Sequence, residues 1–165
     1  AGIELSTGSL GHGLPIAAGL SLAAKRSGQE WRSFVVLSDG ELNEGSNWEA
    51  ALFAAHHGLD NLIAIVDYNK LQGFGRTGEV LELEPLADKW RAFGWETLEV
   101  DGNDVEDLTK VFGNIRPFTN RPTSIIAHTV KGKGVSFMEN RLEWHYMTPN
   151  EEQLCDALTE LDKKV

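Results

Sequence analysis

The stretch FVVLSDGELNEGSNWEAALFAAHHGLDNLIAIVDYNKLQ, residues 34–72, decides the fold. Two short apolar runs, Phe34–Leu37 and Leu62–Val66, stand at either end of a segment with helical periodicity. Each run is bounded by turn-forming residues, as in strands of a parallel sheet that are buried on both faces. The stretch therefore predicts a strand, helix, strand unit, which is the building block of α/β sheets.

The segment between the two runs predicts a helix. Residues 41–45 are acidic and are expected to form a flexible turn, after which Ser46 or Asn47 can cap the helix N-terminus. The helix should end near Gly58. Four side chains are expected on its buried face: Trp48, Ala51, Leu52 and Ala55.

The rest of the chain continues the alternation of helices and strands. The sequence predicts helices over 14–26, 85–93, 105–115 and 151–161, and strands over 95–100 and 123–128. Residues 70–77, 116–122 and 131–150 should be loops or connectors. In the helix over 105–115, Asp104 is the expected cap and the inward residues are Val105, Leu108, Val111 and Phe112. This order predicts a doubly wound, mostly parallel sheet with helices on both faces.

Polar residues follow both strands of the central unit. Asp39 comes after the first run and Asn69 after the second, so both should lie at the carboxyl edge of the sheet, where α/β proteins bind ligands. Together with the backbone carbonyl of Leu71 they form a mixed oxygen set that suits Mg²⁺ or Ca²⁺ better than Zn²⁺. Three protein ligands are too few to enclose the ion, which implies a phosphorylated ligand beside it. Gly40 would let the backbone approach that phosphate.

A glycine-rich segment, Ser6–Gly13, precedes the first predicted helix. Backbone N–H groups at a helix N-terminus can receive a phosphate, but on this segment alone a plain glycine-rich connector is the preferred interpretation. The glycine spacing matches neither a P-loop nor the dinucleotide fingerprint, which argues against a nicotinamide-binding domain. From the residues alone, both the phosphate site and the connector stay open.

Composition narrows the class of protein. The 165 residues, 41% hydrophobic and with a net charge of −10, predict a single domain that binds neither nucleic acid nor an anionic membrane surface. A single cysteine, Cys155, favours a reducing, cytoplasmic location, and we expect neither a spanning helix nor a signal peptide. The chain starts at Ala1 within a few residues of a motif, so we expect a fragment lacking an upstream part, with Met removal as the alternative.

The motifs resemble those of a known family. SDGELNEGSNWEA at 38–50 and NLIAIVDYNKLQ at 61–72 are similar to the thiamine diphosphate motif, and STGSLGHG, KGKGVSFME and WHYMTPN are similar to its transketolase form, especially the N-terminal subunit of split transketolases. The likeness runs from Gly2 to about Leu161. Ser38 replaces the usual first glycine of the motif, and Tyr146 stands where a glycine commonly follows the histidine.

The resemblance implies a thiamine diphosphate-binding fold, specifically its diphosphate-binding domain, with defined metal ligands. Asp39, Asn69 and the carbonyl oxygen of Leu71 would hold Mg²⁺ or Ca²⁺ against the cofactor's diphosphate. Gly40 would donate its N–H to the diphosphate, and the neighbouring Glu41 falls among the cofactor-binding residues.

The same resemblance implies roles for three other segments. The backbone of Gly8, Ser9 and Leu10 would line the cofactor. His145 would contact the diphosphate, face the substrate and be the catalytic residue; without the family, a loop histidine near Trp144 would be preferred. Glu44 would reach a subunit interface or simply be an exposed loop residue. Lys131 and Lys133 would close the substrate channel or be solvated.

The activity implied is that of a transketolase, which transfers a two-carbon ketol unit from a ketose phosphate to an aldose phosphate. The family's catalytic glutamate belongs to a pyrimidine-binding domain that these residues do not resemble, so the chain should need that domain or a C-terminal transketolase subunit, in a homodimer or heterotetramer. Alternatives are a 1-deoxyxylulose-phosphate synthase-like protein, a 2-oxo-acid dehydrogenase component and a noncatalytic fragment.

Overall fold

The centre of the molecule is a four-stranded sheet in the order β1–β2–β6–β5. The computed structural model describes residues 2–115 and 119–163. All three strand pairings are parallel, as the sequence predicted. The strands are β1 (Ser33–Ser38), β2 (Leu62–Tyr68), β5 (Glu96–Asp101) and β6 (Thr123–His128).

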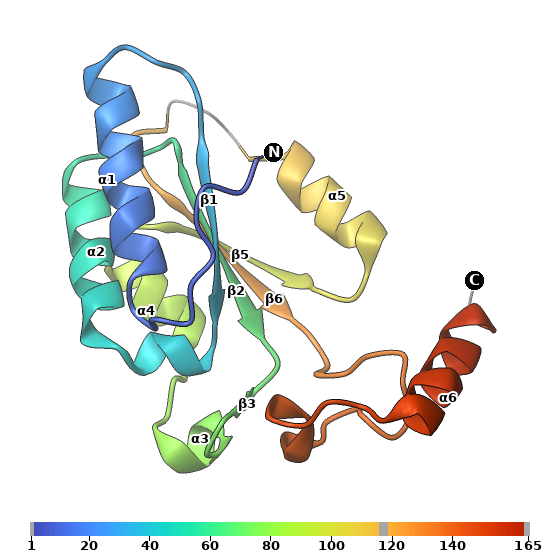
Figure 1. Ribbon diagram of the computed structural model, residues 1–165. Coiled ribbons are helices and arrows are strands. Elements are labelled where there is room, and N and C mark those ends of the chain that lie inside the picture. Colours follow the sequence, from blue (N-terminus) through green and yellow to red (C-terminus); the bar gives the residue numbers. More distant parts are fainter. Residues whose placement is uncertain (1, 116–118, 164–165) are drawn as a thin grey trace.

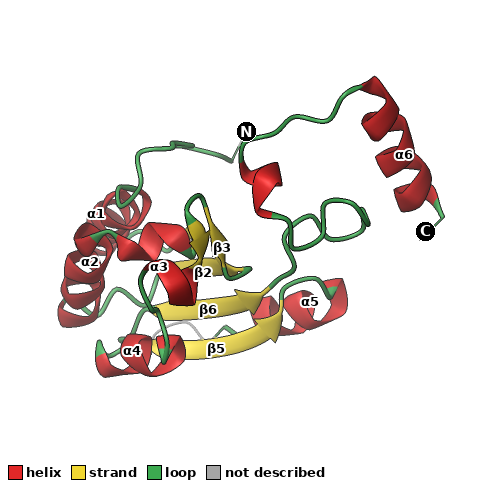
Figure 2. Ribbon diagram, turned by 90° about the horizontal axis from the view of Figure 1, so that it is seen from below, coloured by secondary structure: helices red, strands yellow, loops and turns green. Residues whose placement is uncertain are grey.

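Helices lie on both faces of this sheet (Figure 1). One face is covered by α1 (Gly13–Arg26), α2 (Gly45–His56) and α4 (Leu86–Ala92), and the other carries α5 (Val105–Gly113). The last helix, α6 (Glu151–Asp162), lies away from the sheet at the end of an irregular segment, as Figure 2 shows. The doubly wound α/β prediction is therefore confirmed.

Two hydrophobic clusters, one on each face, hold these layers together. The larger one packs α1, α2 and α4 on the sheet around side chains such as Leu37, Val66 and Trp90. The smaller one packs α5 on the sheet through Ile63 and Ile125, with Leu108 and Val111 of the helix against them. Strand β2 is buried on both faces because it contributes alternate residues to both clusters.

Strand β1 differs from the expectation that it is buried on both faces. Leu37 is buried, but Phe34 is 49% exposed and Val36 is 69% exposed. The reason is that β1 is an edge strand and α5 packs on β5, at the other edge of the sheet. The α5 face of β1 is therefore largely open.

Helix α2 begins earlier than predicted, and one of its four expected inward residues is exposed. Residues 41–45 are not a flexible turn, because Gly40–Asn43 form a 3-10 helix, η1, that leads into α2 at Gly45. Ser46 and Asn47 therefore lie inside the first turn and do not cap it. Ala51 is buried, and Trp48 and Ala55 pack against the larger cluster, as expected. Leu52, also expected inward, is 58% exposed, and the helix buries Asn47, Ala50 and Ala54 as well.

Helix α5 has the predicted N-cap, but its buried side differs from the prediction. The Asp104 carboxylate accepts hydrogen bonds from the N–H groups of Glu106 and Asp107. Val105, expected inward, is 75% exposed, whereas Leu108 and Val111 pack on the sheet as expected. Phe112 is 37% exposed, but its ring contacts Phe34 of β1, with the ring centroids 6.3 Å apart. The helix ends at Gly113, and part of the connector predicted over 116–122 lies outside the described residues.

The loops carry short elements that the sequence did not indicate. Residues 70–77, predicted as a loop, contain the antiparallel pair β3 (Leu71–Gln72) and β4 (Gly75–Arg76), and α3 (Thr77–Val80) follows. A second 3-10 helix, η2, spans Leu142–His145. None of the described helices has the length and apolar character needed to span a bilayer.

Two neighbouring tryptophans give a matched test of the core. Trp90 and Trp95 are both buried, with ring centroids 4.8 Å apart. The Trp95 Nε1–H donates to the Ala51 carbonyl oxygen at 3.0 Å, whereas Trp90 Nε1 has no hydrogen-bond partner among the described residues.

We expect Trp95→Phe to lower the free energy of unfolding by about 1 kcal/mol more than Trp90→Phe. Both changes leave a cavity, but only the first removes a buried hydrogen bond. Urea denaturation followed by circular dichroism measures the difference. Equal losses in the two variants would show that the bond to Ala51 contributes no net stability.

Candidate functional site

The candidate site is built where β1 and β2 end at the same edge of the sheet. Ser38 pairs in register with Asp67, so Asp39 leaves the sheet beside the last residues of β2. Strand β2 runs two residues beyond the predicted run and includes Asp67 and Tyr68, with Asn69 directly after it. The structure thus brings the predicted polar residues to one edge.

Asp39 is the most deeply buried carboxylate of this edge, with 1% of the residue exposed. Its Oδ1 accepts the N–H of Gly40 at 2.7 Å, and its Oδ2 accepts the N–H of Lys70 at 2.5 Å. Lys70 adopts a positive φ of 67°, a conformation that a lysine adopts only at some backbone cost. One side chain therefore joins the turn after β1 to the turn after β2.

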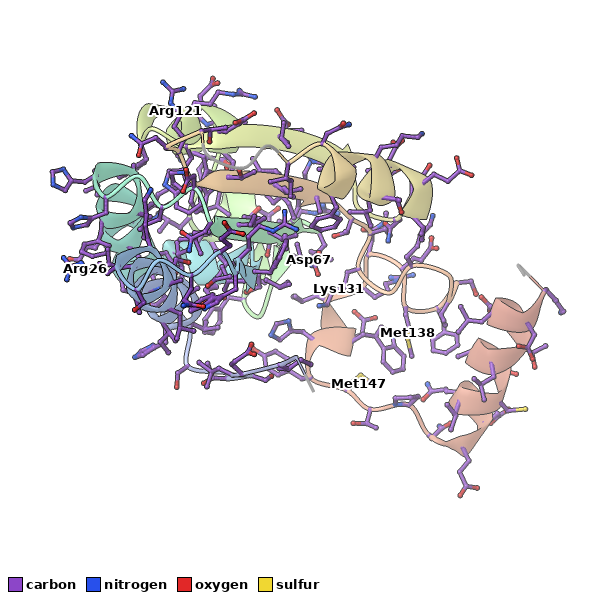
Figure 3. The ribbon with its side chains drawn as sticks, turned by 90° about the horizontal axis from the view of Figure 1, so that it is seen from above. Arg26, Asp67, Arg121, Lys131, Met138 and Met147 are labelled. Atoms are coloured by element: carbon purple, nitrogen blue, oxygen red, sulfur yellow. The ribbon has the colours of Figure 1, made fainter. Side chains whose placement is uncertain are left out.

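Burial makes the ionised form of the Asp39 carboxylate unfavourable. Desolvation raises the pKa of Asp39 to about 6; the hydrogen bonds from Lys70 and Gly40 oppose the rise, nearby Asp67 adds to it, and the charge of Lys131 opposes it. In the view of Figure 3, Asp67 and Lys131 lie near each other, between the sheet and the C-terminal segment. A divalent cation at this place would favour the ionised carboxylate.

Asn69 is oriented by its neighbours on the same edge. Its Oδ1 accepts the N–H of Leu71 at 3.0 Å, and its Nδ2 donates to Asp67 Oδ1 over 3.4 Å. Asp67 is itself fixed, because its Oδ1 also accepts the Thr129 hydroxyl from the segment after β6. These bonds set the direction of the Asn69 amide and leave its carbonyl oxygen a second lone pair.

These donors fit the proposed kind of metal. Asp39 supplies carboxylate oxygens, Asn69 an amide oxygen and Leu71 a backbone oxygen, all hard ligands. Within residues 2–115 and 119–163, no three His, Cys, Asp or Glu side chains gather in a way that could hold a metal ion. Such a site suits a hard cation that completes its coordination shell with water and phosphate oxygens. It does not suit Zn²⁺, which prefers Cys and His ligands.

Packing requires glycine at position 40, in addition to the expected close approach of a phosphate. A Cβ at Gly40 would stand 2.7 Å from the Cβ of Gln72, and Gln72 Nε2 donates to Asn43 Oδ1 at 2.9 Å. The N–H of Gly40, expected to face a diphosphate, donates to Asp39 in this structure. Sequence reasoning missed Gln72 because its contact partners lie about thirty residues upstream.

The glycine-rich segment reaches the same edge through Gly11. Its N–H donates to Glu41 Oε1 at 2.9 Å, and its carbonyl oxygen accepts the Ser46 hydroxyl at 2.7 Å. The preceding Gly8, Ser9 and Leu10 are exposed. Glu41 is buried, and its carboxylate binds the segment through this hydrogen bond from Gly11. Glu44, directly before α2, is exposed.

His145 lies at the end of η2, beside the β3–β4 hairpin that follows Asn69. The Tyr146 hydroxyl donates to the Gly73 carbonyl oxygen at 3.2 Å, and a Cβ on Gly73 would stand 3.4 Å from His145 Nε2. The described ring contacts pair His145 with Tyr146 and Trp144 with Phe137. The exposed imidazole therefore lies beside the hairpin, in contact with Tyr146, the residue that stands where a glycine commonly follows the histidine.

The two loop lysines behave differently. The charge of Lys131 acts on Asp39, whereas Lys133 pairs with Glu139 over 3.8 Å. Lys131 thus belongs to the electrostatic surroundings of the site. Sequence reasoning could find its segment, KGKG, but not which lysine faces the carboxylate.

Known proteins resemble this chain in sequence and in fold. The profile described as "Transketolase, thiamine diphosphate binding domain" matches residues 1–161. The chain is 51% identical over 160 residues to an apulose-4-phosphate transketolase subunit of Actinobacillus succinogenes, covering 97% of this chain and 58% of that protein. It is 42% identical over 163 residues to the 6-deoxy-6-sulfo-D-fructose transketolase subunit SqwG of a Clostridium species, covering 99% and 59%.

Solved structures agree with these relatives. The transketolase of Campylobacter jejuni superposes with a TM-score of 0.90 at 30% identity, covering 98% of this chain and 26% of that one. The Pichia stipitis transketolase with sedoheptulose 7-phosphate gives a TM-score of 0.88 at 26% identity, with 98% and 25% covered. The chain spans somewhat more than half the length of the two subunit relatives and about a quarter of the two full transketolases. On its sequence and fold, it belongs to the transketolase thiamine diphosphate-binding domain family.

Proposed function

We propose that this chain is the diphosphate- and metal-binding component of a thiamine diphosphate-dependent transketolase, with residues 1–165 acting as one domain. The observation that carries the proposal is the buried Asp39 carboxylate, bonded to the turns after both β1 and β2. A buried acid with a raised pKa at the carboxyl edge of a parallel sheet marks a ligand site.

The proposed ligand set follows from the oxygen donors at this edge. Asp39, Asn69 and the Leu71 carbonyl oxygen hold Mg²⁺, or Ca²⁺ in its place, and the ion neutralises the diphosphate of the cofactor. Gly40 allows the close approach of that diphosphate, and Lys131 adds positive charge on the same side. Asp67 keeps the Asn69 amide in place through its contact at 3.4 Å.

The other proposed site residues contact the side of the cofactor and the substrate. The backbone of Gly8, Ser9 and Leu10 lines the cofactor, and His145 contacts the diphosphate and donates a hydrogen bond to the substrate. When bound, thiamine diphosphate supplies the reactive carbon and the electron sink for transfer of a two-carbon unit. This chain's part is to bind, orient and neutralise charge.

The assembly proposed is larger than this chain. A pyrimidine-binding domain or C-terminal transketolase subunit completes the site, in a homodimer or heterotetramer that acts on sugar phosphates in the pentose phosphate pathway or a related cytoplasmic route. Support comes from relatives that are named as transketolase subunits. Those relatives' names include two different ketoses, so the substrate class proposed is a ketose phosphate or a close analogue.

Replacement of one carboxylate tests the metal and cofactor site. We expect Asp39→Asn to weaken binding of thiamine diphosphate with Mg²⁺ by more than about 100-fold, because even outer-shell changes at metal sites cost 10- to 100-fold. Isothermal calorimetry measures the affinity, and Asp88→Asn, an exposed carboxylate on α4, is the control with the same change in charge. Wild-type affinity in Asp39→Asn would contradict the proposed ligand.

The raised pKa of Asp39 predicts that the stability of the metal-free chain depends on pH. The folded state holds a proton on Asp39 up to about pH 6, whereas the unfolded chain releases it near pH 4. The stability contributed by the protonated acid is therefore complete below about pH 4 and is lost as the pH rises through 6.

Two pKa units at 1.36 kcal/mol each give an upper bound of about 3 kcal/mol. We expect the unfolding free energy of the wild type, minus that of Asp39→Asn, to fall by about 1 to 3 kcal/mol between pH 4 and pH 7.5. Urea denaturation with a chelator present measures it. A difference that stays constant with pH would show that Asp39 is ionised throughout.

Reconstitution tests the division of labour. The purified chain alone should not turn over xylulose 5-phosphate with ribose 5-phosphate, because it lacks the pyrimidine-binding domain. Co-expression with a transketolase subunit that carries this domain should give an active complex, and Asp39→Asn in that complex should abolish turnover. Turnover by the chain alone would refute the assignment of this chain as half of the site.

A further inference from the structure

Glu41 is a buried carboxylate with an unusual partner. It follows Gly40 in η1, and its Oε1 accepts the N–H of Gly11, 30 residues upstream, at 2.9 Å. Across the described residues, no lysine, arginine or histidine lies within ion-pair distance of this carboxylate. Burying an acid without a cation costs stability that an apolar side chain would not cost. Stability alone therefore does not explain a glutamate at this position.

Gly11 is held on both of its polar backbone groups. While Glu41 accepts its N–H, the Ser46 hydroxyl donates to its carbonyl oxygen at 2.7 Å. Gly11 has φ of +77°, and a Cβ there would stand 2.4 Å from Ser46 Oγ and 2.8 Å from the Cβ of Glu44. The segment can thus pass close to η1 and α2 only with glycine at this position.

Glu41 is itself tied to the metal-site turn. Its N–H donates to Ser38 Oγ at 3.2 Å, and its carbonyl oxygen accepts Asn47 Nδ2 at 2.7 Å from a fully buried amide. Ser38 and Glu41 enclose the Asp39–Gly40 turn. The chain of bonds therefore runs from the turn, through Glu41, to Gly11.

We propose that Glu41 is a positioning residue: with Ser46 it acts through Gly11 to hold the Gly8–Leu10 backbone at a fixed place relative to the Asp39–Gly40 turn. The inference rests on the proposed function, since it assigns these two segments to one diphosphate. Its content is that Glu41 sets cofactor affinity without touching the cofactor. Holding an exposed segment in its binding conformation lowers the ordering cost of binding.

A matched pair of variants tests the proposal. Glu41→Ala removes the acceptor for the Gly11 N–H, whereas Glu41→Gln keeps an oxygen in the same place and removes the charge. Hydrogen exchange of a peptide covering 8–14 reports the hold on the segment, and calorimetry with thiamine diphosphate and Mg²⁺ reports affinity. A peptide from β2, residues 62–68, reports whether the sheet is intact.

We expect Glu41→Ala to speed exchange in 8–14 and to weaken binding, each by about tenfold, with the β2 peptide unchanged. Glu41→Gln should stay within about threefold of the wild type in both measurements. Ser46→Ala, which removes only the second bond to Gly11, should show the same pattern more weakly. It also provides the test if Glu41→Ala does not fold.

Three results would overturn the inference. Unchanged exchange in 8–14 in Glu41→Ala would show that Glu41 does not hold the segment. Faster exchange with unchanged affinity would show that the segment does not carry the diphosphate. Weak binding by Glu41→Gln with normal exchange would show that the charge acts on the cofactor directly. Absence of binding by the wild type even in complex with a pyrimidine-binding subunit, in contrast, would refute the proposed function and the inference together.

Discussion

The hydrogen bond from the Lys70 N–H to Asp39 Oδ2 is the constraint on which the site depends. It can form only if β1 and β2 are neighbours, parallel and in a register that ends them together. It also requires the chain to turn at Lys70 with positive φ, at some conformational cost. The same carboxylate takes the Gly40 N–H, so the two turns are fixed against each other.

This arrangement buries acidic side chains at a position where burial lowers the stability of the fold. Asp39 and Glu41 are two residues apart and both are buried, and each is satisfied mainly by backbone N–H groups. A core built for stability would avoid such pairs. The structure accepts the cost at one edge of the sheet and compensates for it in the two hydrophobic clusters, which contain fully buried side chains such as Trp90 and Ile125.

The sequence predicted what depends on neighbouring residues. Strand β6 matches its predicted bounds, the Asp104 cap is present, and Asp39 and Asn69 follow adjacent strands. It failed where a distant segment decides. The exposure of Val36 depends on where α5 lies, and the start of α2 at Gly45 follows from η1, whose Glu41 and Leu42 are buried. The bond between Gly11 and Glu41 has no local pattern at all.

The strand order also sets a sequence of events during synthesis. β1 and β2 are consecutive in the chain and adjacent in the sheet, so they can pair as soon as residues 33–68 have left the ribosome. β5 has no such neighbour, because its only place is beside β6, which is synthesised after it. Until residues 123–128 emerge, β5 and the open edge of β2 both lack their partner β6, and unpaired strand edges favour misassociation.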